Sequence, residues 1–434
     1  MSETRHALRG HVIDAPDFGR LRAIPDAAVV IARGKVETVV SASDLAGADI
    51  EWINTGARCP VIVPGLIDIH AHLPQYPAVA RTEDGLLPWL NRHIFPCERG
   101  FRNDRAVGLS EAFFRRLAAN GTTTAMLYAA IWEESCESAF VAAEQSGIRA
   151  IIGKVMMDEG SYGDFAPEPT RALSVAQTDR LCARWHGAGG GLLEYAVSPR
   201  FAVTCSAGLM RDAAALAERH GAYIQTHLSE NHLEISTVAE RFPEARDYTD
   251  VYDAAGLLGE RTVLGHCLHL SDREIGVLAE RGSAVAHCPT SNFFLDSGLM
   301  PLDRLRAAGL RIGLGSDVAG GPELNLWQVM REAVNAQKAR RFADPQVAAL
   351  TPSGAFYLAT QGGAEALGKG ALIGTVQPGK EADLVVLDLE AVLPMEGRFA
   401  GDDPLAPEAV IDALVYRGGP GAVRRVLVKG RTVF

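Results

Sequence analysis

Long apolar runs, paired cysteines and an excess of positive charge are all missing from this 434-residue sequence. No apolar run approaches the roughly 18 residues that a membrane helix requires, and the first residues lack the apolar stretch of a signal peptide. We therefore expect a cytoplasmic protein with no membrane partner. The seven cysteines are scattered and contain no Cys-x-x-Cys pair, so neither a disulfide framework nor a zinc finger is indicated.

The charge balance argues against a partner that is bound through phosphate groups. The chain has 42 Lys plus Arg against 53 Asp plus Glu, which gives a formal net charge of −11. Nucleic-acid binding relies on clustered Lys and Arg, so we expect no nucleic-acid partner. Hydrophobic residues make up 47% of the chain and charged residues 22%, as in a folded protein with a large core.

Buried strand-like runs alternate with amphipathic helices from residue 61 onward, which is typical of a parallel sheet wrapped by helices. Helices are predicted over residues 109–119 and 209–220. Eight strands over about 250 residues favour a (β/α)8 TIM-type barrel. An open doubly wound sheet is less favoured, because no Gly-x-Gly-x-x-Gly follows the first strand. The predicted strands are residues 61–70, 122–128, 150–157, 192–197, 223–227, 262–266, 284–287 and 311–317.

Both ends of the sequence are rich in short strand-like segments. Near the start these are residues 7–15, 28–32 and 36–40, and near the end they are residues 384–387 and 425–428. We expect the two ends to pair. The predicted organisation is therefore a small composite β-sandwich domain of residues 1–62 plus 372–434, and a catalytic barrel of residues 63–371.

Two histidines close the first predicted barrel strand. Alternate residues of a strand point the same way, so His70 and His72 can present their imidazoles to one point. Neutral imidazoles suit a metal ion. By itself His-x-His is a weak signal, and two buried histidines satisfied by hydrogen bonds are an equally good interpretation.

Further metal-ligand residue types end other predicted strands: His227 the fifth, His266 the sixth and Asp317 the eighth. Catalytic groups converge at the C-terminal strand ends of such barrels, so we predict one shared site. Three imidazoles and a carboxylate fit zinc with an open position, and iron or manganese fits the same ligand types. Glu230, three residues after His227, is our candidate proton shuttle. The alternative is a solvated loop glutamate.

Several motifs together resemble the amidohydrolase superfamily: residues 64–72, 226–231, 265–267, 287–292, 315–317 and 373–383. Within that superfamily, the chain is similar to the guanine deaminases. The finer resemblance rests on residues 74–76, 89–91, 95–96 with Glu98, 198–201 and 317–321.

The resemblance implies zinc-dependent hydrolytic deamination of guanine, a small-molecule purine, to xanthine and ammonia by a homodimer. The implied metal ligands of the single zinc ion are His70, His72, His227 and Asp317. The implied catalytic residues are Glu230, Asp317 and His266, and the implied substrate contacts are Gln75, Arg200, Phe201, Glu230 and His266. Many relatives hold two metals through a lysine on the fourth strand. That strand has no lysine here, and Lys154 on the third strand is predicted to be structural or on the surface.

The implied reaction assigns a role to each group. Glu230 would give a proton to the ring nitrogen beside C2, while Asp317 with His266 would take the proton of the attacking water. Arg200 can only donate hydrogen bonds, so it suits the carbonyl at position 6 of guanine and not the amino group of adenine. Phe201 offers a ring face to the purine plane.

Two other functions fit the same residues. The nearer one is a deaminase of a related amino-substituted heterocycle, such as ammeline or another aminotriazine, 8-oxoguanine or a pterin. The more distant one is a non-catalytic amidohydrolase-like scaffold. A substrate comparison separates the first from guanine deamination, and metal analysis separates the second.

Overall fold

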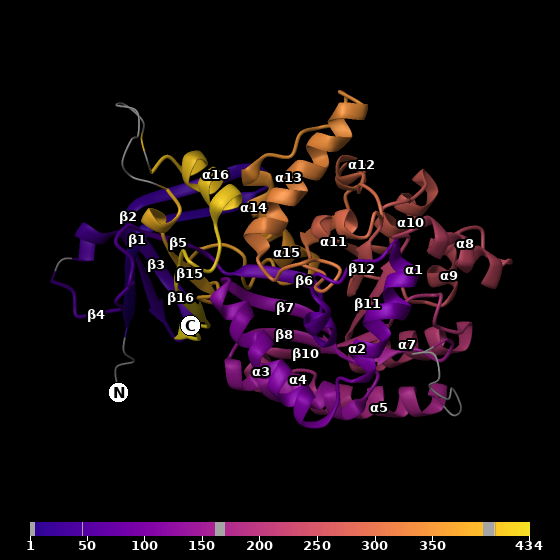
Figure 1. Ribbon diagram of the computed structural model, residues 1–434. Helices are drawn as coiled ribbons and strands as arrows, with labels where there is room; N and C mark the ends of the chain where they lie inside the picture. The colour runs from indigo at the N-terminus through magenta and orange to yellow at the C-terminus, as the bar shows by residue number, and fades with distance from the viewer. Residues whose placement is uncertain (1–4, 46, 161–169, 394–402, 404) are drawn as a thin grey trace.

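The computed structural model describes residues 5–45, 47–160, 170–393, 403 and 405–434. A sheet of parallel strands forms its larger part (Figure 1), in the order β14-β13-β12-β11-β10-β8-β7-β6, with β9 beside β10. The strands are β6 (Leu66–His72), β7 (Thr122–Tyr128), β8 (Arg149–Gly153), β9 (Val155–Met156), β10 (Leu193–Pro199), β11 (Tyr223–Leu228), β12 (Thr262–His266), β13 (Ala284–His287) and β14 (Arg311–Leu314).

Backbone hydrogen bonds close this sheet into a barrel. The N–H of Asp317, just beyond β14, donates to the carbonyl of His70 on β6 at 2.8 Å, and the N–H of His72 donates to the carbonyl of Val318 at 3.0 Å. The predicted (β/α)8 TIM-type barrel is therefore confirmed. The closure also brings Asp317 directly against the two histidines of β6.

Helices surround the barrel and supply its outer core. The predicted helix at residues 109–119 lies within α3, and that at 209–220 lies within α7, which ends at Gly221 with a left-handed φ of 61°. The surrounding helices are α3 (Asn103–Ala119), α4 (Glu133–Ser146), α5 (Thr170–Trp185), α7 (Ala207–His220), α8 (His232–Arg241), α9 (Tyr248–Ala254), α10 (Asp272–Arg281), α11 (Pro289–Phe294), α12 (Leu302–Ala307), α13 (Leu326–Ala343), α14 (Pro352–Leu358) and α15 (Gln361–Ala366).

Two apolar clusters hold the barrel together. Side chains such as Ile69, Met126, Ile151 and Val263 fill its interior, where Ala364 of α15 packs with them. A larger cluster lies between the strands and the surrounding helices. Because the interior is filled, polar groups of the strands gather beyond their C-terminal ends.

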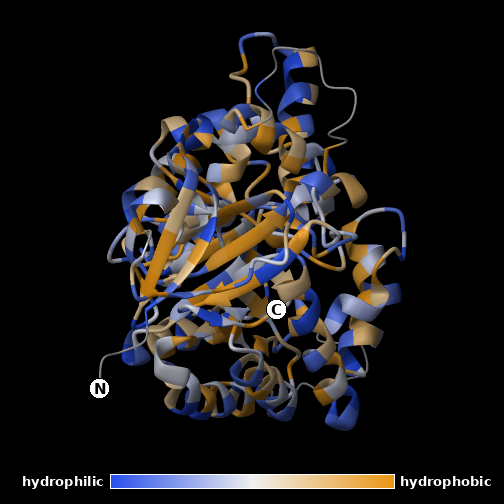
Figure 2. Ribbon diagram, turned by 90° about the vertical axis from the view of Figure 1, so that its left-hand side faces the viewer, coloured by the Kyte–Doolittle hydropathy of each residue, from blue (hydrophilic) through white to orange (hydrophobic). Residues whose placement is uncertain are grey.

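The two ends of the chain form one further sheet, as the sequence predicts. Its order is β17-β16-β15-β5-β1-β2-β3, with β4 beside β1, and β15 pairs antiparallel with β5. Figure 2 views the molecule from this side and shows that most of these strands are hydrophobic. The strands are β1 (His6–Asp17), β2 (Arg20–Ala32), β3 (Lys35–Ser41), β4 (Glu51–Trp52), β5 (Pro60–Pro64), β15 (Leu384–Asp388), β16 (Val423–Val428) and β17 (Arg431–Thr432). The domain boundaries near residues 62 and 372 stay a prediction.

The predicted first barrel strand, residues 61–70, is in fact two strands that belong to different sheets. β5 ends at Pro64 and β6 begins at Leu66, so the chain changes sheet at Gly65. A Cβ atom at Gly65 would lie 1.9 Å from the hydroxyl of Thr123, so only glycine fits there. The apolar run is continuous because both strands are buried, which hides the break.

The last predicted barrel strand also differs from the prediction, since β14 ends at Leu314 and Asp317 lies in the loop after it.

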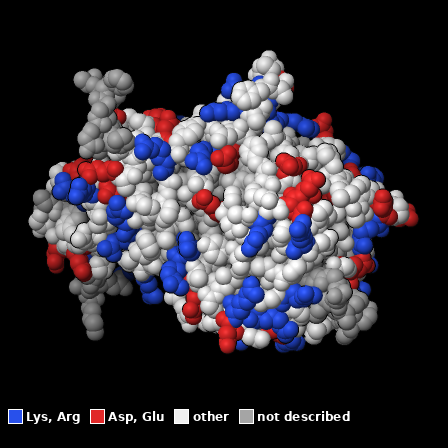
Figure 3. Space-filling view, in the orientation of Figure 1, with Lys and Arg blue, Asp and Glu red and all other residues white. Residues whose placement is uncertain are grey.

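Within the described residues, no helix combines the length and the apolar character that a membrane crossing needs. On the face drawn in Figure 3, basic and acidic side chains are interspersed.

Candidate active site

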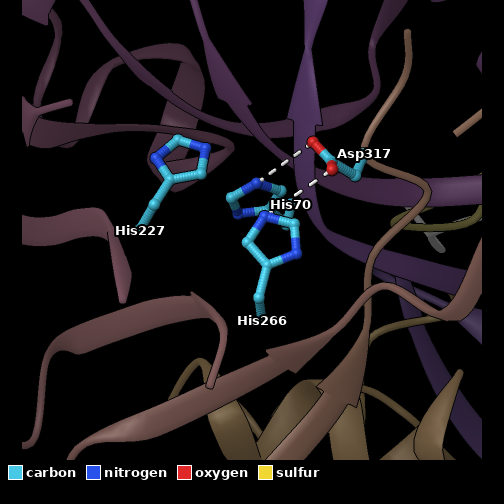
Figure 4. Close-up of side chains that lie close together, drawn as sticks. All are labelled: His70, His227, His266 and Asp317. Atoms are coloured by element: carbon cyan, nitrogen blue, oxygen red, sulfur yellow. Dashed lines mark ion pairs between the residues drawn. The ribbon is translucent and has the colours of Figure 1, made fainter. Parts of the chain in front are cut away.

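The histidines of β6 and the carboxylate of Asp317 meet at one end of the barrel. The Nε2 atoms of His70 and His72 lie 3.3 and 3.2 Å from Oδ1 of Asp317. Figure 4 shows that His70, His227 and His266, which come from different strands, lie close to Asp317 of the loop after β14, with dashed lines marking the ion pairs of Asp317. Asp317 and His266 adopt left-handed φ angles of 48° and 69°. Such angles are rare outside glycine and cluster at functional sites.

Hydrogen bonds orient the other two imidazoles toward the same point. Nδ1 of His227 lies 2.8 Å from the carbonyl oxygen of Arg200, and since that oxygen only accepts, Nδ1 carries the proton. Nε2 of His227 then faces Nε2 of His72 at 3.1 Å. Nδ1 of His266 likewise lies 3.0 Å from Oδ1 of Asn292. A ligand histidine held by its other ring nitrogen is a common feature of metal sites.

The structure brings together five predicted site residues, and they allow two sets of metal ligands. The five are His70, His72, His227, His266 and Asp317. One ligand atom each from His70, His227, His266 and Asp317 lies within 4.8 Å of all the others. The predicted set has His72 in place of His266. His266 Nε2 is 3.7 Å from Oδ2 of Asp317, whereas His72 Nε2 is 3.2 Å from Oδ1, so the closer contact belongs to His72.

The electrostatics of this cluster suit a cation. Burial lowers the pKa of His72 to about 4 and that of His227 well below its usual value, so both rings are neutral at pH 7. Burial alone would raise the pKa of Asp317, but the neighbouring His70, His72 and His266 hold it well below its usual value. Neutral imidazoles and an ionised carboxylate are the protonation states that metal ligands need.

Buried ring nitrogens without hydrogen bonds point to the same conclusion. His70 is only 1% exposed, yet within the described part of the chain neither of its ring nitrogens makes a hydrogen bond, and Nε2 of His266 makes none either. These two Nε2 atoms face only carboxylate oxygens, of Asp317 and Glu230, each at 3.3 Å. Leaving such groups unsatisfied is costly. A metal ion that accepts their lone pairs removes this cost, so these residues fit a metal site.

Glu230 is buried beside this cluster, not solvated. It is 3% exposed, accepts a hydrogen bond of 3.0 Å from the hydroxyl of Ser297 at Oε1, and its Oε2 lies 3.3 Å from Nε2 of His266. Burial, and then the negative charge of Asp317, raise the pKa of Glu230 to about 8. The carboxyl group is therefore able to hold a proton at neutral pH and to donate it.

A pocket with about 350 Å³ of empty space opens over these groups. All the predicted substrate contacts line it, and so do apolar residues of a helical segment over the pocket, α1 (Leu86–Trp89) and the π-helical turn η3 (Leu90–Ile94). The lining residues are His72, Gln75, Leu86, Trp89, Leu90, Arg200, Phe201, His227, Glu230, His266, Leu295 and Asp317.

Sequence reasoning gave no role to four buried residues that hold this site: Asp68, Glu98, Asn292 and Ser297. Asp68 accepts the N–H of Ser316 at 3.0 Å and its hydroxyl at 2.6 Å, next to Asp317. Its place two residues before His70, in the same alternation as the histidines, is the one local signal. Glu98 and Asn292 lie in segments that carry the family resemblance, but the resemblance assigned them no role, and Ser297 has no sequence signal.

Lys154 is buried, which excludes the predicted surface position. Its ammonium group donates to the hydroxyl of Ser174 at 3.0 Å and to the carbonyl of Val155 at 3.3 Å, and burial lowers its pKa to about 8. The structural role that the sequence predicts is therefore the right one. The strand β10 contains no lysine, as expected.

The profile of the Amidohydrolase family matches residues 61–433. The chain belongs to this family. This amidohydrolase is 35% identical over 452 residues to "Guanine deaminase" of Escherichia coli (strain K12), a match that covers 99% of this chain and 98% of the relative. It is 37% identical over 379 residues to "Guanine deaminase" of Mus musculus, covering 86% and 82%. The structure of guanine deaminase from C. acetobutylicum with bound guanine superposes with a TM-score of 0.91 at 30% identity, covering 99% of this chain and 100% of the other.

Proposed function

We propose that this amidohydrolase converts guanine and water to xanthine and ammonia. The observation that carries the proposal is a single pocket lined by Glu230, Arg200 and Gln75. The same pocket is lined by His72, His227, His266 and Asp317. Whole-chain similarity to guanine deaminases, one of them with guanine bound, supports the same reaction. The pocket supplies both a proton donor and a hydrogen-bond donor for a purine carbonyl.

We further propose a single zinc ion held by His70, His72, His227 and Asp317, with His266 beside it. Three imidazoles and one carboxylate suit zinc, while iron and manganese accept the same atoms. When bound, the ion lowers the pKa of a water molecule toward neutrality and so supplies a nucleophile. Hydrogen bonds to the carbonyl of Arg200 and to the side chain of Asn292 fix the second ring nitrogens of His227 and His266.

The side chains around the cluster move the protons of the reaction. Glu230, whose pKa is raised to about 8, gives its proton to the ring nitrogen next to C2 as the water adds. Asp317 is ionised and lies 3.7 Å from Nε2 of His266, so this pair receives the proton of the water. The C2–N bond breaks when this pair gives that proton to the amino group, which leaves as ammonia, and the proton of the hydroxyl added at C2 passes to the Glu230 carboxylate as the new C2 carbonyl forms.

The polar side chains of the pocket select the purine. The guanidinium of Arg200 donates to the carbonyl at position 6, where adenine has an amino group that offers no acceptor. Gln75 supplies a further donor, and Phe201 packs against the ring plane. A buried site left with unpaired donors can reject an analogue by about 10⁴- to 10⁵-fold.

A homodimeric assembly and a cytoplasmic location stay predictions that rest on the family resemblance and on the sequence. Sedimentation velocity of the metal-loaded protein tests the first. Fluorescence microscopy of the tagged full chain in its own cells tests the second.

Steady-state assays with guanine, ammeline, isoxanthopterin, 8-oxoguanine and adenine test the function itself. We expect guanine to give the highest kcat/KM, with ammonia and xanthine formed in equal amounts. A higher kcat/KM for any of the other heterocycles would replace guanine as the substrate. If a protein with a full metal site turned over none of them, the enzymatic function would be wrong.

A further inference from the structure

Behind the pocket, a buried glutamate joins the two polar side chains that we propose to read the purine. Nη1 of Arg200 donates to Oε1 and Oε2 of Glu98 at 2.8 and 2.7 Å, and Nε2 of Gln75 donates to Oε1 of Glu98 at 2.8 Å. Glu98 is 1% exposed and belongs to α2 (Phe95–Arg99), the short helix that follows η3. It does not line the pocket itself. It therefore touches both Arg200 and Gln75 from the side away from the substrate.

The carboxylate determines which way the amide of Gln75 points. A carboxylate only accepts hydrogen bonds, so the nitrogen of Gln75 has to face Glu98. The amide oxygen is then turned to the backbone N–H of Ala319, which donates to it at 3.3 Å. Both neighbours require the same orientation, so the usual ambiguity between amide oxygen and nitrogen is removed. The second hydrogen of Nε2 remains on the amide as a donor, and Gln75 lines the pocket.

Glu98 also compensates the charge of Arg200. Both side chains are at most 3% exposed, and an arginine does not lose its proton in a protein. Without a carboxylate next to it, the guanidinium would be a buried uncompensated cation, which is strongly unfavourable. With Glu98 in place, Arg200 sits in the pocket wall as one half of a neutral pair. A neutral wall suits a neutral base such as guanine.

We propose that Glu98 is the positioning residue that sets purine specificity, by holding Arg200 and Gln75 as hydrogen-bond donors to the carbonyl edge of the substrate. The inference rests on the proposed guanine deamination and assigns part of its selectivity to a residue that does not contact the purine. It requires that a change of Glu98 lowers kcat/KM more for a purine that carries a carbonyl at position 6 than for one that lacks it.

The variant Glu98→Gln keeps the size of the side chain and removes its charge. Its amide group would have to face two donors, Nη1 of Arg200 and Nε2 of Gln75, and it can satisfy them only with its single oxygen. Turning Gln75 over does not help, since its nitrogen would then face the N–H of Ala319. Every arrangement of the two amides places at least one pair of donors against each other, so Arg200 and Gln75 have to shift.

The experiment compares guanine with 2-aminopurine, which carries the same amino group at C2 but no oxygen at position 6. Each purine is measured as a substrate, and 2-aminopurine also as a competitive inhibitor of guanine turnover. For Glu98→Gln we expect kcat/KM for guanine to fall by about 100-fold, mainly through KM, because a buried charge-assisted pair is broken. For 2-aminopurine we expect less than about a tenfold change, since it never had the lost bond.

A matched control removes a buried carboxylate from an arginine elsewhere. Asp383 contacts Arg149 at the N-terminal end of β8, opposite the pocket, at 3.2 Å. Asp383→Asn also replaces a buried carboxylate by an amide, while Arg149 keeps its ion pair with Glu381. We expect it to lower the thermal unfolding temperature and to leave the ratio of kcat/KM for guanine to kcat/KM for 2-aminopurine within about twofold of wild type. Metal content and unfolding temperature are recorded for both variants, so that loss of fold is seen separately from loss of selectivity.

The outcomes separate the two proposals. The positioning role is supported if Glu98→Gln keeps its full metal content and the ratio of kcat/KM for guanine to kcat/KM for 2-aminopurine falls by about tenfold or more. Equal losses for both purines, or no change for either, would overturn that role and leave guanine deamination standing. If wild-type protein with a full metal site did not deaminate guanine, the proposed function would fail, and the role of Glu98 would fail with it.

Discussion

The Nε2 atoms of His72 and His227 lie 3.1 Å apart in a buried space between β6 and β11. Because the carbonyl of Arg200 fixes the proton of His227 on Nδ1, the facing nitrogen of His227 presents a lone pair to His72. Oδ1 of Asp317, 3.2 Å from Nε2 of His72, adds negative charge at the same point. Lone pairs and an ionised oxygen that converge in this way are stabilised by a cation.

A pair of variants distinguishes the two ligand sets. If His72 is a ligand, His72→Asn lowers metal affinity far more than His266→Asn, which keeps the metal and loses turnover. Metal content after dialysis, measured by mass spectrometry alongside kcat, reads both effects. His220→Asn, which changes a histidine on α7 far from the cluster, serves as the control. Metal loss in His266→Asn with retention in His72→Asn would instead favour the set of His70, His227, His266 and Asp317.

Asp68 is expected to support metal binding without touching the metal. It accepts two hydrogen bonds from Ser316, the residue before Asp317. In Asp68→Asn one acceptor is lost, so we expect the metal dissociation constant to rise by about 10- to 100-fold, as for other residues that orient ligands. Competition with a chromophoric chelator measures it, and Asp179→Asn, at a surface His220 pair, provides the control. An unchanged dissociation constant would refute this role.

Glu230 is expected to contribute to kcat and not to metal binding. Glu230→Gln removes the proton donor, so kcat should fall by about 10²- to 10⁴-fold, the usual contribution of a general acid. Metal content should stay at the wild-type level. A variant that kept more than a tenth of wild-type kcat would show that the proton comes from another group.

The pH dependence of kcat follows from the same carboxyl group. An acid acts in its protonated form, so activity is present below the pKa of Glu230 and is lost as pH rises through it. That pKa is raised to about 8, and the charge of a bound cation lowers it, so we expect the alkaline limb at or below about pH 8. The hydroxyl of Ser297 stabilises the ionised form.

Ser297→Ala therefore should move the alkaline limb of kcat to higher pH, because the ionised carboxylate loses a hydrogen bond. The matched control is Ser236→Ala, which removes an exposed hydroxyl on α8 that donates to the carbonyl of Leu233. A shift of the limb to lower pH in Ser297→Ala, or an equal shift in the control, would contradict this account.

The barrel and the convergence of the histidines with Asp317 could be predicted because their signals are local. Apolar strand-like runs, glycines that end helices, and His or Asp residues at strand ends can each be recognised from a few neighbouring residues. The geometry of the barrel then brings His227 and His266 to the histidines of β6. The resemblance to known motifs added the roles of Gln75, Arg200 and Phe201. These three residues do line the pocket with Glu230.

The parts that sequence could not give depend on long-range contacts. The break at Gly65 is hidden because β5 and β6 are both fully buried, so the apolar pattern continues across two sheets. Glu98 and Arg200 are 102 positions apart, and no periodicity links them. The resemblance includes Glu98 but assigns it no contact, and only the fold places it against Arg200 and Gln75.

Zinc titration of metal-free protein with guanine as substrate tests the central claim most directly. The account predicts that xanthine formation is absent without metal, rises in proportion to added zinc, and reaches its plateau at about one ion per chain, as for a mononuclear catalytic site. Full guanine turnover by the metal-free protein, or none at any zinc loading, would contradict it.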